Sequence, residues 1–261
     1  MVKISEIIDR LETFAPIELQ EGYDNCGLQV GDRDMSVDKA LLCTDVIEAV
    51  VDEAIEKNIK LIIAHHPLLF RGLKQITGKS YIERIVCKAI KNDIAIYCAH
   101  TNMDKCYGGV SYKMAEKLNL NNVMPLVADE KDSKTGLGCI GELVEPIDAK
   151  ELLMKIKLIF NVKTIRHTKL LSHKIKKIAL CGGAGAEFAS IAASKGADMY
   201  ITADLKYHDF FSFDNQTVIA DIGHFESEQI IKEIFYEQLI DFFPNFATLN
   251  ANSEENPVFY I

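Results

Sequence analysis

The chain has 261 residues, which is enough for one large domain or two lobes with a sizeable core. Its composition, 48% hydrophobic and 26% charged, is that of an ordinary globular protein, and its net charge of −9 offers no positive surface to nucleic acid. We therefore expect no nucleic-acid partner. We expect no membrane insertion either, because every apolar run is far shorter than the roughly 18–20 residues that span a bilayer.

Helical and strand patterns alternate through the first half of the chain. Residues 1–19 predict an amphipathic helix, because Ile4, Ile7, Ile8 and Leu11 share one face. Further along, the predicted strands are 39–43, 59–64 and 94–99, and the predicted helices are 46–58, 81–92 and 109–120. This order is typical of βαβ units with a buried, largely parallel sheet.

The second half resumes the alternation after a polar connection. The predicted strands are 137–147, 177–181, 197–203 and 217–221, and the predicted helices are 148–160, 187–196 and one long helix from about 225 to 241. We expect an α/β protein with mostly parallel or mixed sheets. Its first lobe is predicted over 1–125 and its second over 126–224, with the C-terminal segment 225–261 packing on the first lobe.

The second half also repeats the first, which predicts an internal duplication of one α/β unit. Residues 39–66 align without gaps on residues 177–204, at an offset of 138 positions. A second match, at an offset of 124, places His100 on His224, and each of these histidines has a carboxylate four residues later. The two lobes are therefore expected to be related.

Histidines and carboxylates gather where the predicted strands end, the edge at which open α/β sheets bind ligands. Four such ends carry His65 and His66, His100 with Asp104, Asp204 with His208, and His224 with Glu228. The two other histidines, His167 and His173, have polar surroundings and are interpreted as surface residues.

Imidazoles and carboxylates without thiolate suit Zn, Mn, Fe, Ni or Co. Any one of these histidines is also compatible with an ordinary hydrogen-bonded core position, and His224 and Glu228, at i and i+4, with a simple ion pair. Asp104 is also compatible with a turn or helix-capping role. The constellation as a whole favours a metal site, since independent core histidines have no reason to collect at strand ends.

Other features carry less functional information. The glycine-rich stretch 181–188 lacks the G-K-[ST] of a phosphate loop and is interpreted as a tight strand-to-helix turn. Seven cysteines, an odd number without a C-x-x-C pair, are typical of reduced thiols in a cytoplasmic protein. Cys26 and Cys106 are therefore interpreted as structural.

Six blocks of sequence resemble the Nif-three-like dinuclear-metal proteins, also named type 2 homologues of GTP cyclohydrolase I. The blocks are DNCGLQVGD (24–32), AHHPLLFRGLKQI (64–76), HTNMDKCYGGV (100–110), TADLKYHDF (202–210), GHFESE (223–228) and NPVFYI (256–261). The resemblance runs nearly end to end and implies the short form of the family, without an inserted middle domain. It also implies a homohexamer, with the metal pair in a cleft between the lobes.

The resemblance further implies two divalent metal ions per chain, of unspecified identity. By position, their ligands would be His65, His66, His224 and Glu228, with Asp104 as the bridging carboxylate. His100 and His208 would be nearby polar residues able to carry protons in catalysis.

Two classes of function follow from these expectations. The first is a dinuclear-metal hydrolase acting on a small molecule, such as a nucleotide. Its reaction would be either the ring opening of GTP to formate and dihydroneopterin triphosphate or a simpler phosphoester hydrolysis. The second is a non-catalytic metal-binding scaffold or metal-handling protein, which would use the same ligands.

Overall fold

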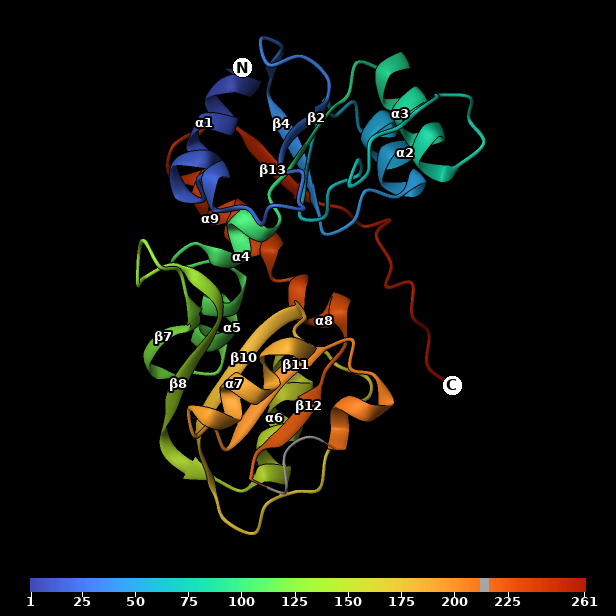
Figure 1. The fold of residues 1–261 in the computed structure, drawn as a ribbon. Helices are drawn as coiled ribbons and strands as arrows, with labels where there is room; N and C mark the ends of the chain where they lie inside the picture. The colour runs from blue at the N-terminus through green and yellow to red at the C-terminus, as the bar shows by residue number, and fades with distance from the viewer. Residues whose placement is uncertain (212–215) are drawn as a thin grey trace. The chain divides into compact units, whose positions relative to one another are not determined.

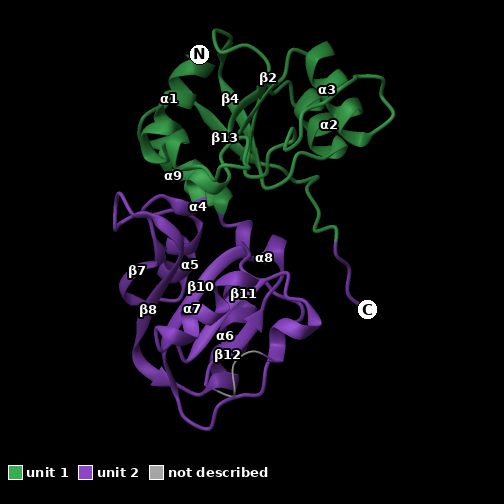
Figure 2. Cartoon of the chain, viewed as in Figure 1, with its two compact units in different colours: residues 1–103, 231–257 green, residues 104–230, 258–261 purple. Residues whose placement is uncertain are grey.

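The computed structural model describes residues 1–211 and 216–261, and the chain divides into two compact units. Unit 1 comprises residues 1–103 and 231–257, and unit 2 comprises residues 104–230 and 258–261 (Figure 2). The limits differ from the expected 1–125 and 126–224. Helix α5 (Val110–Lys117) packs on strands of unit 2, so the first division falls before it.

Unit 1 contains a five-stranded sheet in the order β13-β4-β5-β6-β2 (Figure 1). Its strands are β13 (Ala247–Asn250), β4 (Lys39–Cys43), β5 (Leu61–Ala64), β6 (Ala95–Cys98) and β2 (Gly27–Val30). All neighbouring pairs are parallel except β2 with β6. Strands β5 and β6 are buried along their whole length, because helices cover both faces of the sheet.

Two pairs of helices cover the sheet of unit 1. Helices α1 (Ile4–Phe14) and α9 (Ile231–Ile240) contact each other on one side, and α2 (Glu48–Glu56) and α3 (Tyr81–Lys91) contact each other on the other (Figure 1). The predicted apolar face of α1 is fully buried, since Ile4, Ile7, Ile8 and Leu11 are at most 1% exposed. Smaller elements are β1 (Val2–Lys3), β3 (Ser36–Val37) and the 3₁₀ helix η1 (Ile17–Leu19).

Unit 2 contains a six-stranded mixed sheet in the order β7-β8-β10-β11-β12-β9. Its strands are β7 (Asn121–Ala128), β8 (Gly136–Ile147), β10 (Ile175–Ala184), β11 (Met199–Ala203), β12 (Val218–Asp221) and β9 (Arg166–His167). Its helices are α5, α6 (Ala149–Ile159), α7 (Ala189–Ser194) and α8 (His224–Glu228), with the 3₁₀ helices η2 (Ala186–Phe188) and η3 (Tyr207–Phe211). Strands β10, β11 and β12 are parallel to one another, like β4, β5 and β6 of unit 1.

Strand register supports the predicted duplication. Leu41 of β4 pairs with Ile62 of β5, and the residues 138 positions later, Ala179 and Tyr200, pair with each other in unit 2. Each unit therefore contains the same pair of parallel strands in the same register.

The third strand of each unit, β6 or β12, also corresponds between the units. The offset between these two strands differs by one from the 124 positions that separate His100 from His224. Ile96 and Ile219 pair with equivalent residues of the middle strands, which is an offset of 123. Because His100 and His224 are 124 positions apart, one additional residue lies between β12 and its histidine.

The long helix predicted over 225–241 is two helices. Helix α8 ends at Glu228 and α9 begins at Ile231, and the chain passes from unit 2 to unit 1 between residues 230 and 231. The short helix α4 (Thr101–Lys105) likewise contains the first passage, between Met103 and Asp104. The sequence pattern of 225–241 indicates one helix and so does not reveal the second crossing, whereas α4 lies in a segment for which the sequence predicts no helix.

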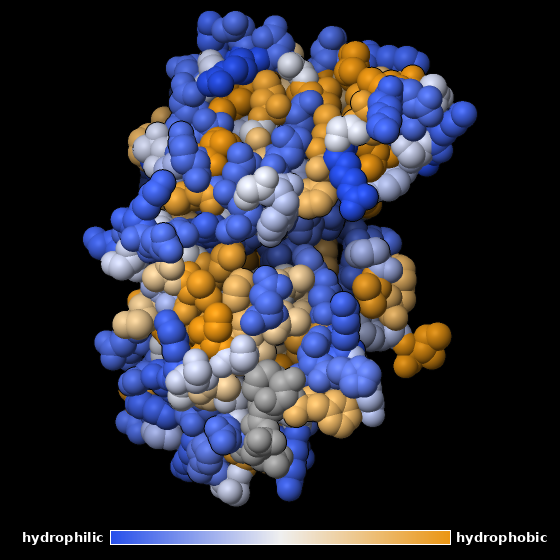
Figure 3. All heavy atoms as spheres, viewed as in Figure 1, coloured by the Kyte–Doolittle hydropathy of each residue, from blue (hydrophilic) through white to orange (hydrophobic). Residues whose placement is uncertain are grey.

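Polar and apolar side chains are interspersed over the face drawn in Figure 3. Within residues 1–211 and 216–261, no helix has both the length and the apolar character that a membrane crossing requires.

Glu53 of α2 holds the C-terminal segment of unit 1 in place. Its carboxylate accepts hydrogen bonds from the backbone of Asn252 at 2.9 Å, from the backbone of Ser253 at 2.8 Å and from the Ser253 hydroxyl at 2.6 Å. Lys57 donates a further hydrogen bond to Glu53. Burial raises the pKa of this carboxyl, but the four hydrogen-bond donors outweigh burial and lower the pKa from 4.5 to about 2.

A carboxyl group whose pKa is lower in the folded than in the unfolded chain stabilises the fold at any pH above its unfolded pKa. It loses that contribution as the pH falls toward its folded pKa. We expect the free energy of unfolding to decrease between pH 4.5 and about 2, and Glu53→Gln to make that decrease smaller. At pH 7, Glu53→Gln should lower the free energy of unfolding by about 1–2 kcal/mol, because its donors lose charged hydrogen bonds. Urea denaturation at several pH values measures both effects.

The matched control is Glu56→Gln, on the exposed side of the same helix. An equal pH response of the two variants would contradict the role given to Glu53.

Candidate metal site

Three histidines of unit 1 meet where two neighbouring parallel strands end. His65 and His66 follow β5, and His100 follows β6 after one intervening residue. Their ring centroids lie 5.0 Å (His65–His66), 5.2 Å (His65–His100) and 5.3 Å (His66–His100) apart. One ligand atom from each ring lies within 4.8 Å of the others, so the three imidazoles could hold one metal ion.

The ring of His65 is fixed by the backbone. His65 is fully buried, and its Nδ1 lies 2.9 Å from the carbonyl oxygen of Ala99. A carbonyl oxygen only accepts hydrogen bonds, so Nδ1 carries the proton and Nε2 is the nitrogen with a lone pair. In this tautomer Nε2 is free of a proton and can bind a metal ion.

Carboxylates fix the other two rings in the same way. The Nδ1 atom of His66 lies 2.9 Å from Asp45 Oδ1, and the Nδ1 atom of His100 lies 2.9 Å from both carboxylate oxygens of Asp24. Metal-binding histidines commonly donate their second ring N–H to a carboxylate or a carbonyl, which sets the ring orientation and raises the basicity of the ligating nitrogen. All three histidines of unit 1 have such an acceptor.

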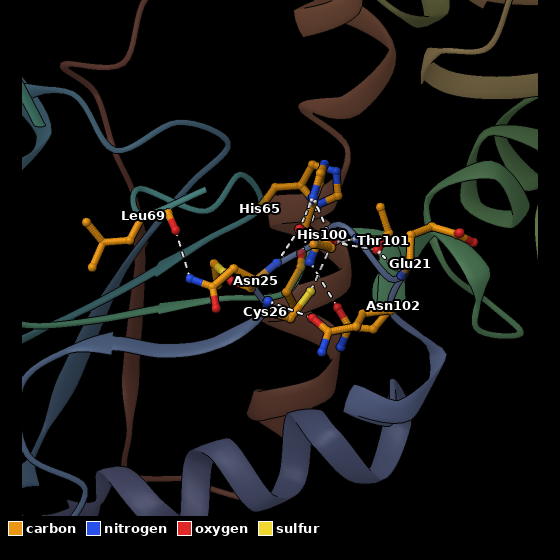
Figure 4. Close-up of polar contacts among 12 residues, drawn as sticks. Glu21, Asn25, Cys26, His65, Leu69, His100, Thr101 and Asn102 are labelled. Atoms are coloured by element: carbon orange, nitrogen blue, oxygen red, sulfur yellow. Dashed lines mark hydrogen bonds and ion pairs between the residues drawn. The ribbon is translucent and has the colours of Figure 1, made fainter. Parts of the chain in front are cut away.

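Asp24 is itself held in a network of donors. Burial raises its pKa, but hydrogen bonds from His100 and from the hydroxyl of Thr101 outweigh burial and hold the pKa well below its usual range. The backbone N–H of Thr101 adds a further bond to Asp24 at 3.0 Å. Figure 4 shows His100 and Thr101 with Cys26, whose pKa is lowered chiefly by a hydrogen bond with the Cys98 thiol.

In unit 2, His224 at the start of α8 has a carboxylate on each side. Its Nδ1 lies 2.8 Å from Asp204 Oδ2, and its Nε2 lies 2.9 Å from Glu228 Oε2. The side chain of Glu228 is 4% exposed. A neutral imidazole can donate to only one of two carboxylates, so a bound cation would satisfy the nitrogen facing Glu228 without a second proton.

The glycine-rich stretch makes room for Glu228. The pairing of β10 with β11 shifts between Leu180 and Ala184, so Gly182 and Gly183 lie in a bulge rather than in a simple turn. Gly183 has φ of +61°, and a Cβ atom added there would lie 2.0 Å from Glu228 Oε1 and 3.1 Å from His224 Nε2. Only glycine leaves the space that these two side chains occupy.

Asp104 lies in unit 2 near the end of α4 and is half-buried. Burial raises the pKa of the Cys181 thiol, and the carboxylates of Asp104 and Glu228 raise it further. Both carboxylates therefore act on the same buried thiol.

The predicted strand-end residues differ in whether they belong to a group of potential metal ligands. His100 belongs to the histidine cluster of unit 1, whereas His208 lies on η3, with its ring 5.3 Å from that of Tyr207 and 6.2 Å from that of Phe211. In the part of the chain that the structure describes, no group of three or more potential metal ligands includes His208, Asp104 or Asp204. His167 and His173 are exposed, as expected.

Sequence reasoning missed the residues that orient the histidines. Asp24 and Asp45 lie in loops, 76 and 21 positions away from the histidines that they contact. One feature of the sequence could have identified Asp45. It lies two residues after β4, and so at a strand end of the same sheet as the histidines.

The donor set fits a divalent transition metal. Imidazole nitrogens with fixed tautomers in unit 1, and an imidazole with buried carboxylates in unit 2, are the N/O ligands that Zn, Fe, Mn, Ni and Co accept. The structure thus supports a site that could hold a metal.

Comparison with known proteins gives one family over nearly the whole chain. The model of the family described as Duf34/NIF3 (NGG1p interacting factor 3) matches residues 2–257. A Clostridium perfringens protein named GTP cyclohydrolase 1 type 2 homolog is 40% identical over 228 residues, which are 87% of each chain. A Lactococcus lactis protein of the same name is 32% identical, with 100% of both chains covered.

Solved structures agree with this result. A Staphylococcus aureus hypothetical protein superposes with a TM-score of 0.92 at 28% identity, covering 100% of this chain and 99% of that one. A Bacillus cereus protein related to NIF3 gives a TM-score of 0.89 at 26% identity, with 99% of both chains covered. The fold is therefore shared over the full length of these chains.

Replacing the carboxylate that orients His66 should weaken metal binding. We expect Asp45→Asn to raise the dissociation constant for Co²⁺ or Zn²⁺ about 10–100-fold, because the ring loses a charged acceptor that fixes its tautomer. Isothermal titration calorimetry on metal-stripped protein measures this change. Asp52→Asn, an exposed carboxylate paired with Lys88 on α3, is the control and should bind like the wild type. Equal affinity of the Asp45 variant and the wild type would refute the orienting role.

Filling the space at Gly183 should disturb the unit 2 ligands. We expect Gly183→Ala to lower metal affinity at least 10-fold, because the new methyl group displaces Glu228. Gly196→Ala is a matched control, since Gly196 also has a positive φ, of +73°, but has open space around its Cβ position. Metal titration of both variants separates the steric effect from backbone strain. Equal losses in the two variants would mean that strain alone is responsible.

Proposed function

The chain belongs to the Duf34/NIF3 family, and from this membership and the geometry of its histidines we propose that it is a divalent-metal-dependent hydrolase. The observation that carries the proposal is the cluster of His65, His66 and His100. Each ring has its Nδ1 held by an oxygen acceptor, and ligand atoms of the three rings lie within 4.8 Å of one another. Three pre-oriented imidazoles are more than a structural role needs.

The proposed ligands of two metal ions are those that the family resemblance implies. They are His65, His66, His224 and Glu228, with Asp104 as the bridging carboxylate. Asp104 lies four residues after His100, on the short helix α4, and is half-buried. The fixed tautomers of the unit 1 histidines and the buried carboxylate of Glu228 support this assignment.

Divalent ions held by these ligands would supply a water acidic enough to act as a nucleophile near neutral pH. The protein's own contribution is to fix the ligand rings and to move protons. His100 is suited to proton transfer, because Asp24 holds its Nδ1 and leaves Nε2 as the nitrogen that exchanges a proton with substrate. His208 is the second proposed proton carrier, on a separate short helix of unit 2.

The proposed substrate is a small molecule of the nucleotide class, and GTP is the first to test. The support is that relatives covering 87–100% of the chain carry the name GTP cyclohydrolase 1 type 2 homolog. In that reaction the imidazole ring of guanine opens by hydrolysis and formate leaves. A phosphoester is the next substrate to test, because the same ligands and the same nucleophile would serve.

Elemental analysis and a formate assay test the proposal. We expect about two divalent ions per chain in the wild type, and at most about one in His65→Ala and in Asp104→Asn, because each loses a ligand. Metal-stripped protein should release formate from GTP only after a divalent ion is restored. His173→Ala, at an exposed histidine, is the control for both assays.

Unchanged metal content in the ligand variants would exclude this site. Full metal content without turnover of GTP or of phosphoesters would instead favour a metal-handling role.

A further inference from the structure

Two cysteines of unit 1 lie on neighbouring strands next to the histidine cluster. Cys98 is the last residue of β6, and Cys26 immediately precedes β2, whose first residue, Gly27, is the Cα partner of Cys98. Opposed Cα atoms of antiparallel strands are about 4.5–5.5 Å apart, so a residue one position further along lies within the range that a disulfide can bridge.

The backbone at Gly27 allows the two cysteine side chains to approach each other. In a regular strand, successive side chains point to opposite faces, so Cys26 would point away from the face that Cys98 shares with Gly27. Gly27 has φ of +106°, a conformation outside the strand region that breaks this alternation. Cys98 Sγ accordingly lies 3.3 Å from the carbonyl oxygen of Asn25, the residue that immediately precedes Cys26.

The two thiols differ in exposure. Cys98 is fully buried, with its Sγ 3.3 Å from the carbonyl oxygen of Asn25, whereas Cys26 is half-buried, with its Sγ 3.3 Å from Asp24 Oδ2. Of the seven cysteines, only Cys26 and Cys87 are not buried. An oxidant from solution can therefore reach Cys26, and the buried Cys98 thiol lies on the neighbouring strand, beside the backbone that leads into Cys26 (Figure 4 labels Cys26).

We propose that Cys26 and Cys98 form a peroxide-reactive pair that closes to an intramolecular disulfide. The Cys26 sulfur attacks hydrogen peroxide, so an S–O bond forms, the O–O bond breaks and hydroxide leaves. The Cys98 sulfur then attacks the Cys26 sulfenic acid, so the S–S bond forms and water leaves. In total, two thiols and one peroxide give one disulfide and two waters, and a dithiol reductant reverses the change.

The disulfide would act on the neighbouring site through Asp24. Oxidation removes the Cys26 S–H group that lies beside Asp24, the carboxylate that orients His100. It also ties residues 24–27 covalently to β6. The oxidation itself needs neither the metal nor the substrate proposed above, so it stands or fails independently of that function.

Peptide mapping of the full chain tests the pair. Reduced protein, freed of reductant, is treated with equimolar hydrogen peroxide, blocked with iodoacetamide and digested without reductant for mass spectrometry. We expect a linked peptide joining Cys26 to Cys98, which disappears after treatment with dithiothreitol. In Cys98→Ser the link should be absent, and Cys26 should instead be trapped as a sulfenic acid by dimedone.

Cys87→Ser is the matched control, because it removes the other half-buried cysteine of unit 1 and should leave the yield of the link unchanged. Circular dichroism verifies that each variant is folded. The proposal is overturned if the wild type shows Cys26 oxidised singly without the link. It is also overturned if the disulfide that forms joins Cys26 to another cysteine, or if Cys87→Ser abolishes the link.

Discussion

The parallel pairing of β5 with β6 is the constraint on which the rest of the site depends. Parallel strands end at the same edge of a sheet, so the residues that follow neighbouring strands lie close together without help from any other element. His65 and His66 follow one strand and His100 follows the other, and their rings come within contact distance. Both strands are buried, which means that the apolar core of unit 1 fixes the position of the three imidazoles.

The strands place the histidines but do not set the orientation of each ring. Hydrogen bonds to acceptors outside these strands set that orientation. A backbone carbonyl holds His65, and carboxylates from two loops hold His66 and His100. These acceptors make all three rings present the same nitrogen. The geometry is thus divided between a buried sheet, which places the ligands, and polar loops, which select their tautomers.

This division explains how much the sequence predicted. Strands and the histidines at their ends follow from apolar runs and a repeated pattern, both of which are local signals, and these predictions agree with the structure. Asp24 and Asp45 carry no local signal of their partners, because they reach the histidines only through tertiary folding. The two passages between units were also missed, because the predicted helix 225–241 runs through residues 230–231 and because the short helix α4 at residues 103–104 was not predicted.

Comparison of the two repeats shows how one unit can acquire two different sites. At the offset of 138, Asp45 corresponds to Gly183, and His66 corresponds to Asp204. In unit 1 the position after the first strand supplies the carboxylate that orients a histidine. In unit 2 the same position has no side chain, and the space is filled by Glu228 instead. The orienting carboxylate then comes from Asp204, at the position of His66, and the histidine that it orients is His224, at the position of His100. One backbone arrangement therefore gives a nitrogen-rich set in unit 1 and an oxygen-rich set in unit 2.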